Sequence, residues 1–240
     1  MTTLIKLEIM RVLRNRRYLF FTVIYPVALY ALMLTAYGKT SDLSGVSVKA
    51  YFMVSMATLG TVGAALTGNA QRISLERKSG WTRQLRLTAL PSWGYVVAKI
   101  AAVAAATLPA ILAVFLFGFL EGVKLSAVEW IALGLTLWVG GFVFAALGVA
   151  IGYAAGPDSV QPIVMICYMG MVLLGGTWFP LSGSFGDFAK WTPVAIYNQL
   201  GRIAQAGASV DMKQLVAAAA YLAVFVGLAA WLYQRDRKEA

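Results

Sequence analysis

The chain has 240 residues, of which 60% are hydrophobic and only 12% are charged, and its mean hydropathy is +0.74. A soluble domain carries roughly twice that share of charged residues, so the composition excludes a soluble fold and predicts an integral membrane protein. The net charge of +10 is typical of topology signals and of contact with anionic lipid, so we expect the lipid bilayer as a partner and no nucleic acid.

The residue types that most enzymes need are scarce. The chain has no histidine and a single cysteine, Cys167, which excludes histidine-dependent catalysis and an internal disulfide. The "GKT" at 38–40 is not a phosphate-binding loop, because Met33 stands where that motif needs a glycine. We therefore expect no catalytic residue, no metal site and no ATP site in this chain.

Residues 1–17 predict an amphipathic helix that lies in the lipid headgroup layer. Apolar residues alternate here with basic ones, and the arginines of the expected interfacial helix are Arg11, Arg14, Arg16 and Arg17. A plain basic anchor for the first membrane span explains the same charges, and the two interpretations are compatible.

Long apolar runs predict an all-α membrane protein with six transmembrane helices, forming a single transmembrane domain over residues 1–240. Each run is close to, or longer than, the roughly 20 residues that a helix needs to cross the hydrocarbon layer. The expected spans are 18–37, 50–70, 94–120, 127–153, 162–179 and 214–234.

Basic residues predict that both termini lie in the cytoplasm. With the N-terminus inside, the expected cytoplasmic pieces carry 14 of the 20 Lys and Arg residues and the outer pieces carry six. Cytoplasmic loops are the ones enriched in these residues. Residues 71–93 are then the first cytoplasmic loop and residues 180–213 an extracellular segment.

The loop at 71–93 is basic but also carries apolar residues suited to a protein contact. These are Ile73, Leu75, Trp81, Leu85 and Leu87. Apolar anchors inside a charged rim are typical of an interface. A positive tether resting on lipid is the alternative interpretation.

Two further patterns concern helix packing. Gly148, Gly152 and Gly156 are spaced by four in the fourth expected span, which predicts close approach of another helix. Such spacing more often reflects packing within one chain than a seam between two copies. In the outer segment, Thr192 and Pro193 predict a helix start. We expect short re-entrant helices before the last span, shielded by protein, although an ordinary surface loop is the alternative.

Three stretches of the sequence carry a resemblance to a known family. They are "RVLRNRRYLFFTVIYPV", "SLERKSGWTRQLRLTALPSWGYVVAKI" and "GGTWFPLSGSFGDFAKWTPVAIYNQLGR". In this order, the chain resembles the permease subunit of ABC-2 type ABC transporters, the group that includes exporters of drugs and antibiotics. It departs from the family where Lys78 and Ser79 replace an acidic residue that often follows Glu76, so the loop is unusually basic.

The resemblance implies roles for particular residues. A coupling helix at about 72–88 would rest on a separate ATP-binding subunit, with Glu76 available to pair with that partner. The implied coupling residues are Leu75, Glu76, Arg77, Gly80, Trp81, Arg83 and Leu85. The implied extracellular gate comprises Phe179, Pro180, Trp191 and Pro193. Spans one, two and five would line the substrate path, for which the aromatic and apolar candidates are Tyr25, Tyr30, Phe52, Met56, Tyr168 and Trp178.

The resemblance also implies an assembly in the bacterial cell membrane. It would contain two copies of the ATP-binding subunit, which hold ATP and Mg²⁺, and a second permease subunit, as a homodimer or a paralogous heterodimer. The expected cargo is a drug, an antibiotic or another amphipathic or lipid-like molecule. Three alternatives stay open: a gradient-driven carrier or channel, an accessory membrane subunit without its own pathway and, least favoured by the residues, a membrane enzyme.

Overall fold

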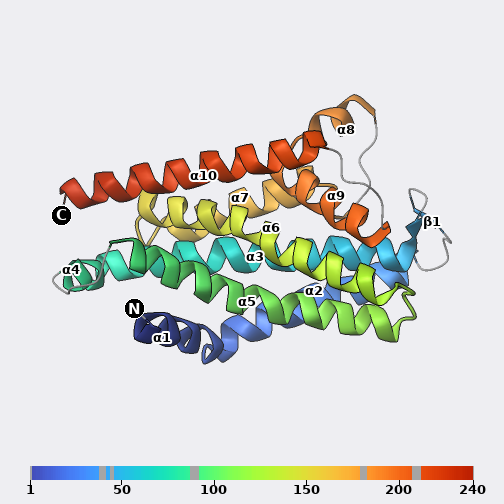
Figure 1. The fold of residues 1–240 in the computed structure, drawn as a ribbon, viewed down its shortest axis with the longest axis horizontal. Helices are drawn as coiled ribbons and strands as arrows, with labels where there is room; N and C mark the ends of the chain where they lie inside the picture. The colour runs from blue at the N-terminus through green and yellow to red at the C-terminus, as the bar shows by residue number, and fades with distance from the viewer. Residues whose placement is uncertain are drawn as a thin grey trace.

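The computed structural model describes residues 2–37, 42–43, 46–86, 92–178, 183–206 and 212–239. Helices make up nearly all of this part, and the strands β1 (Asp42–Leu43) and β2 (Val46–Ser47) form one short antiparallel pair. Figure 1 shows the long helices packed side by side along one direction. The helices are α1 (Thr2–Leu13), α2 (Arg16–Tyr37), α3 (Val48–Lys78), α4 (Trp81–Arg86), α5 (Ser92–Leu120), α6 (Ala127–Ala154), α7 (Val160–Leu174), α8 (Gly183–Ala189), α9 (Pro193–Ala206) and α10 (Met212–Glu239).

Five helices are long and apolar enough to cross a membrane within the described ranges, one fewer than the sequence predicts. They are α2, α3, α5, α6 and α10. The expected span at 162–179 forms α7, which has only 15 residues because it ends before Gly175 and the turn at Gly176, where φ is +61°. The helical class is confirmed, whereas a sixth full span is not.

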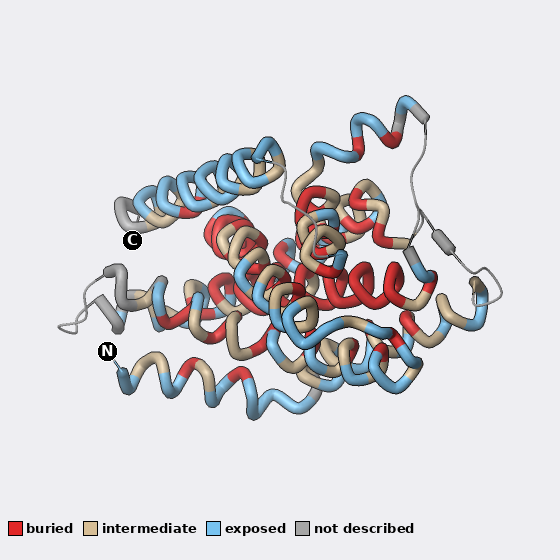
Figure 2. The backbone as a smooth tube through the Cα atoms, turned by 45° about the vertical axis from the view of Figure 1, so that its right-hand side comes forward, coloured by how far each residue is buried: buried red, intermediate tan, exposed pale blue. Residues whose placement is uncertain are grey.

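The centre of the molecule is α3. Nearly every residue from Val48 to Ala70 is buried, and α3 contacts α2, α5, α6, α7 and α9. Figure 2 shows the buried residues concentrated at this centre, while α10 is mostly exposed. Among the five long helices, α3 is therefore the most enclosed and α10 the most exposed.

Two of the three spaced glycines pack α6 against α3. A Cβ atom on Gly148 would lie 2.9 Å from the backbone oxygens of Ala65 and Leu66, and one on Gly152 would lie 3.0 Å from that of Ala70. The expected packing within one chain is therefore confirmed at Gly148 and Gly152. Gly156 lies beyond the end of α6, and its nearest such neighbour is Ser159 at 3.9 Å.

The helix start expected in the outer segment is also confirmed. Helix α9 begins at Pro193, and the Thr192 hydroxyl accepts a hydrogen bond from the backbone N–H of Ala195 (3.4 Å). Both chain ends and α4 lie at one end of the bundle, whereas β1 and α9 lie toward the other (Figure 1). Which side of the membrane each end faces stays a prediction, as do the re-entrant helices.

Candidate functional site

A buried cluster of charges joins three helices at the end of the bundle that holds the N-terminus. Lys99 Nζ on α5 lies 2.9 Å from the Glu8 carboxylate on α1 and 2.7 Å from the Glu76 carboxylate on α3. Arg11 and the Tyr95 hydroxyl also donate to Glu76, at 3.0 Å and 2.7 Å. The side chain of Lys99 is only 1% exposed, so α1 is held to α3 and α5 by charges that water barely reaches.

The physics of this cluster is a balance between desolvation and pairing. Removing a charge from water costs several kcal/mol, and only close partners with good geometry offset that cost. Lys99 has two carboxylates at hydrogen-bond distance, and its ammonium also lies 5.0 Å from the centre of the Tyr95 ring. The Tyr95 hydroxyl adds a charge-assisted hydrogen bond to the Glu76 carboxylate.

The structure corrects the expected coupling helix at about 72–88. Residues 72–78 are the last turns of α3, and a separate helix, α4, begins at Trp81. The break lies at Gly80, whose φ of +73° is a conformation that glycine adopts without strain. The chain therefore turns between the end of the long helix α3 and the short helix α4.

The expected coupling residues divide into exposed and engaged side chains. Leu75 is 57% exposed and Trp81 is 40% exposed, as a docking surface requires. Glu76 is buried and bound inside this chain, contrary to its expected pairing with a partner subunit. Arg77 lies 2.7 Å from Asp236 on α10 and donates to the backbone oxygen of Gly152. The side chains of Arg83 and Leu85 lie outside the described residues.

The interfacial arginines occupy the end of α1 and the start of α2. Arg14 and Arg16 are exposed, as snorkelling side chains are expected to be, and Arg11 reaches Glu76 while staying 60% exposed. The side chain of Arg17 lies outside the described residues. Helix α1 is thus amphipathic, and it ends at Leu13, before the first long helix begins.

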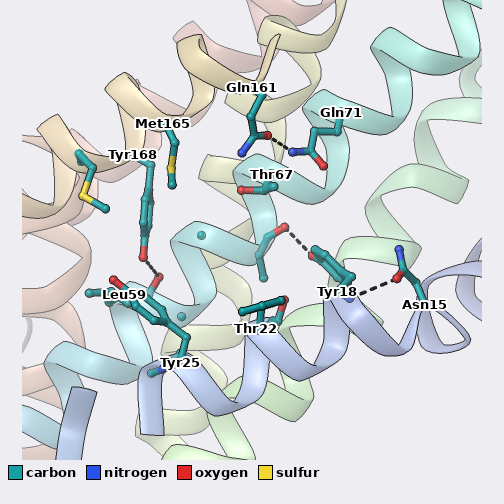
Figure 3. Close-up of a pocket in the computed structure, with 16 residues that line it drawn as sticks. Asn15, Tyr18, Thr22, Tyr25, Leu59, Thr67, Gln71, Gln161, Met165 and Tyr168 are labelled. Carbon is teal, nitrogen blue, oxygen red and sulfur yellow. Dashed lines mark hydrogen bonds between the residues drawn. The ribbon is translucent and has the colours of Figure 1, made fainter. Parts of the chain in front are cut away.

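An open cavity of about 700 Å³ lies between α2, α3 and α7. Figure 3 shows side chains from all three helices around it, including Tyr25 from α2 and Tyr168 from α7. The Tyr168 hydroxyl donates to the backbone oxygen of Leu59 on α3 (3.2 Å). The lining is mostly apolar, with a few hydroxyl and amide groups, which suits an amphipathic ligand.

Only part of the expected substrate path lines this cavity. Of the six candidate residues, Tyr25 and Tyr168 line the cavity. Tyr30, Phe52 and Met56 are completely buried in the core of the chain, where a cargo could not reach them without a rearrangement. Trp178 is partly buried, follows the end of α7 and does not line the cavity.

The expected gate residues lie around α8 and α9. Trp191 is exposed between the two helices, and Pro193 starts α9. Phe179 and Pro180 lie outside the described residues.

Sequence reasoning missed several residues of both sites. Glu8 was not singled out, although it is the single acidic residue between positions 1 and 17 and lies on a basic helix. Gln71 on α3 and Gln161 on α7 also line the cavity and bond to each other (Figure 3). For the two glutamines, the available signal was a polar residue next to the end of an apolar span.

Comparison with known proteins agrees with this architecture. The family model for ABC-2 type transporters matches residues 1–202. The chain is 28% identical over 237 residues to YvfS of Bacillus subtilis (strain 168), a protein named as a transport permease, and the match covers 97% of this chain and 96% of the relative. With its long apolar helices, the chain is a bacterial membrane protein. It belongs to the ABC-2 type transporter family, whose members are non-catalytic membrane subunits of transporters and associate with ATP-binding subunits.

Proposed function

We propose that this chain is the permease subunit of an ATP-driven exporter and that the cavity between α2, α3 and α7 is its share of the translocation path. The observation that carries the proposal is the cavity itself, which is open, mostly apolar and large enough for a drug-sized molecule at about 700 Å³. Three helices that belong to the expected spans one, two and five surround it. A second permease subunit, either a copy of this chain or a paralogue, completes the path.

ATP binding and hydrolysis, with ATP and Mg²⁺, belong to a separate subunit that contacts the turn between α3 and α4. The exposed Leu75 and Trp81 supply apolar anchors there. Because the last turns of α3 are tied to α1 and α5 through Glu76, a push on this turn moves all three helices together. The cargo is a drug, an antibiotic or another amphipathic or lipid-like molecule.

Co-purification with an ATPase tests the coupling part of this proposal. The tagged chain is isolated from its native membranes in mild detergent, its soluble partners are identified, and ATP hydrolysis by the eluate is measured. We expect a stoichiometric ATP-binding subunit that is lost on Trp81→Asp. The matched control is Trp191→Asp, the same change of an exposed tryptophan on a different helix boundary, which should retain the subunit.

A chain that purifies intact but alone, without ATPase activity, would reject ATP coupling and favour a gradient-driven carrier. Retention of the subunit by Trp81→Asp would reject the docking surface only. A complex that binds the ATPase but is indifferent to changes in the cavity would favour an accessory subunit.

The path part is tested by filling the cavity. Met165 lines it, whereas the neighbouring Ile166 is 73% exposed and does not line it. We expect Met165→Trp to abolish stimulation of the complex's ATPase by a panel of amphipathic compounds while the basal rate persists. Ile166→Trp should leave the stimulation intact, and equal behaviour of the two variants would contradict the assignment.

A further inference from the structure

A second cavity lies at the far end of the bundle, away from the charge cluster. It has a volume of about 370 Å³ and is bounded by the start of α3, the end of α7, and helices α8 and α9. Its polar lining residues are Tyr51, Lys190, Asn198, Gln199 and Arg202. No aspartate or glutamate lines it among the described residues, so the charged groups that line it are both cationic.

Arg202 is held in this cavity without a counter-charge. Its guanidinium carbon lies 3.5 Å from the centre of the Tyr51 ring, and one of its nitrogens donates to the Ser55 hydroxyl at 3.0 Å. No carboxylate pairs with Arg202 in the part of the chain that the structure describes. Lys190, by contrast, is exposed and lies 2.7 Å from Asp187.

Arg202 is half-buried, and no carboxylate of the described residues balances its charge. Burial lowers the pKa of its guanidinium, as removal from water does for any cation. The group remains charged at neutral pH, and a guanidinium carries more N–H donors than Ser55 and Tyr51 can accept. The stacked ring fixes the plane of the group, which prepares its donors for a planar or tetrahedral oxyanion.

We infer that this cavity binds an anionic oxygen group, a phosphate or a similar oxyanion, with Arg202 as the charged donor and Asn198 and Gln199 beside it. The Tyr51 hydroxyl donates to the backbone oxygen of Gly176 (3.3 Å), which ties the stacking ring to the opposite wall. The group can belong to a phospholipid or to a soluble phosphate, because both present the same oxygens. The inference needs no ATPase and therefore stands or falls separately from the proposed function.

Thermal unfolding of the purified chain in a neutral detergent tests the site. One arm adds sodium phosphate against sodium chloride at equal ionic strength. The other adds phosphatidic acid against diacylglycerol, which differs from it by the phosphate group alone. We expect a concentration-dependent rise in Tm with at least one phosphate probe and not with its control. Phosphatidic acid acting alone identifies a lipid headgroup, and an effect of both probes shows that soluble phosphate also enters.

Two variants link the binding to this cavity. Arg202→Gln removes the charge, and Gln199→Glu places a carboxylate beside Arg202 from an exposed position that does not support the core. Each variant should raise the apparent Kd for the phosphate probe by at least about tenfold. Lys124→Gln removes an exposed positive charge from the connection between α5 and α6 and should bind as wild type.

The inference is overturned if neither probe stabilises the chain beyond its control, or if either folded variant keeps the wild-type affinity. It is overturned equally if Lys124→Gln weakens binding as much as they do, because the effect would then be general. Should Arg202→Gln fail to fold, Gln199→Glu alone decides.

Discussion

The two ends of the bundle hold a cation in opposite ways, one buried and the other half-buried. At one end Lys99 has two carboxylates within 2.9 Å, both supplied by helices of the same chain. At the other end Arg202 has an aromatic face and a hydroxyl, and no carboxylate among the described residues. A cation paired inside the chain fixes helices to one another, whereas one left short of charge can attract a ligand.

The largest loss of stability should come from removing the charge of Lys99, the cation that is paired with two carboxylates. Lys99→Met leaves Glu8 and Glu76 buried beside an apolar side chain and should lower the free energy of unfolding by about 3–5 kcal/mol. Denaturant titration in micelles measures it. Lys78→Met, at an exposed position in the last turn of α3, is the control and should change stability little. A loss equal to that of the control would mean that water reaches the cluster.

The second largest loss of stability should follow removal of the Tyr95 hydroxyl. Its hydroxyl donates to the Glu76 carboxylate at 2.7 Å, and a hydrogen bond to a charged group contributes roughly 1.5–3 kcal/mol. Tyr95→Phe should therefore cost about that much in the same titration. Tyr221→Phe, which removes an exposed donor to the backbone oxygen of Trp191, should cost less. Equal losses would indicate that Glu76 is satisfied without Tyr95.

Arg202→Gln should destabilise the unliganded chain less than Lys99→Met does. It removes a stacking contact and one hydrogen bond, about 0.5–2 kcal/mol in total, and strands no carboxylate. Unfolding of the two variants in the absence of phosphate gives the comparison directly. If Arg202→Gln lowered the free energy of unfolding as much as Lys99→Met, the two ends of the bundle would not differ in how they balance their cation.

The smallest effect should come from Arg11. Its side chain is 60% exposed, and Glu76 keeps Lys99 and Tyr95 when Arg11 is removed. Solvent screening then limits the loss on Arg11→Gln to roughly 1 kcal/mol or less. The loss should shrink further in high salt, while that of Lys99→Met should not. If salt reduced the loss of stability in both variants, Lys99 would be more accessible to water than the structure shows.

The long helices were predictable because a membrane imposes one length and one composition on its spans. The expected segments at 94–120 and 127–153 agree with α5 and α6 to within two residues. The expected span at 162–179 failed because its apolar run continues past Gly175, where the backbone leaves the helix. Hydropathy sums side chains and is insensitive to such a turn.

Partners across the bundle could not be predicted in the same way. Glu76 and Lys99 are 23 positions apart, and Glu8 is 91 positions from Lys99, so no local pattern joins them. The composition of the loop at 71–93 predicted contact with another protein, whereas the Glu76 side chain is buried inside this chain. The sequence shows which segments are basic or acidic, but the tertiary packing decides which charged side chains contact each other.

The burial of α3 has a consequence for how the protein is made. Although α3 is the least apolar of the five long helices, it is the most enclosed, and the amide of Asn69 finds its partner on α6 at Ala145. A newly synthesised α3 must wait for that partner, because Ala145 lies 76 positions after Asn69 in the chain. Until then it is a poor candidate for release into lipid by itself. Membrane integration of this chain should therefore be delayed and collective, with α3 retained by the insertion machinery until α5 and α6 arrive to enclose it.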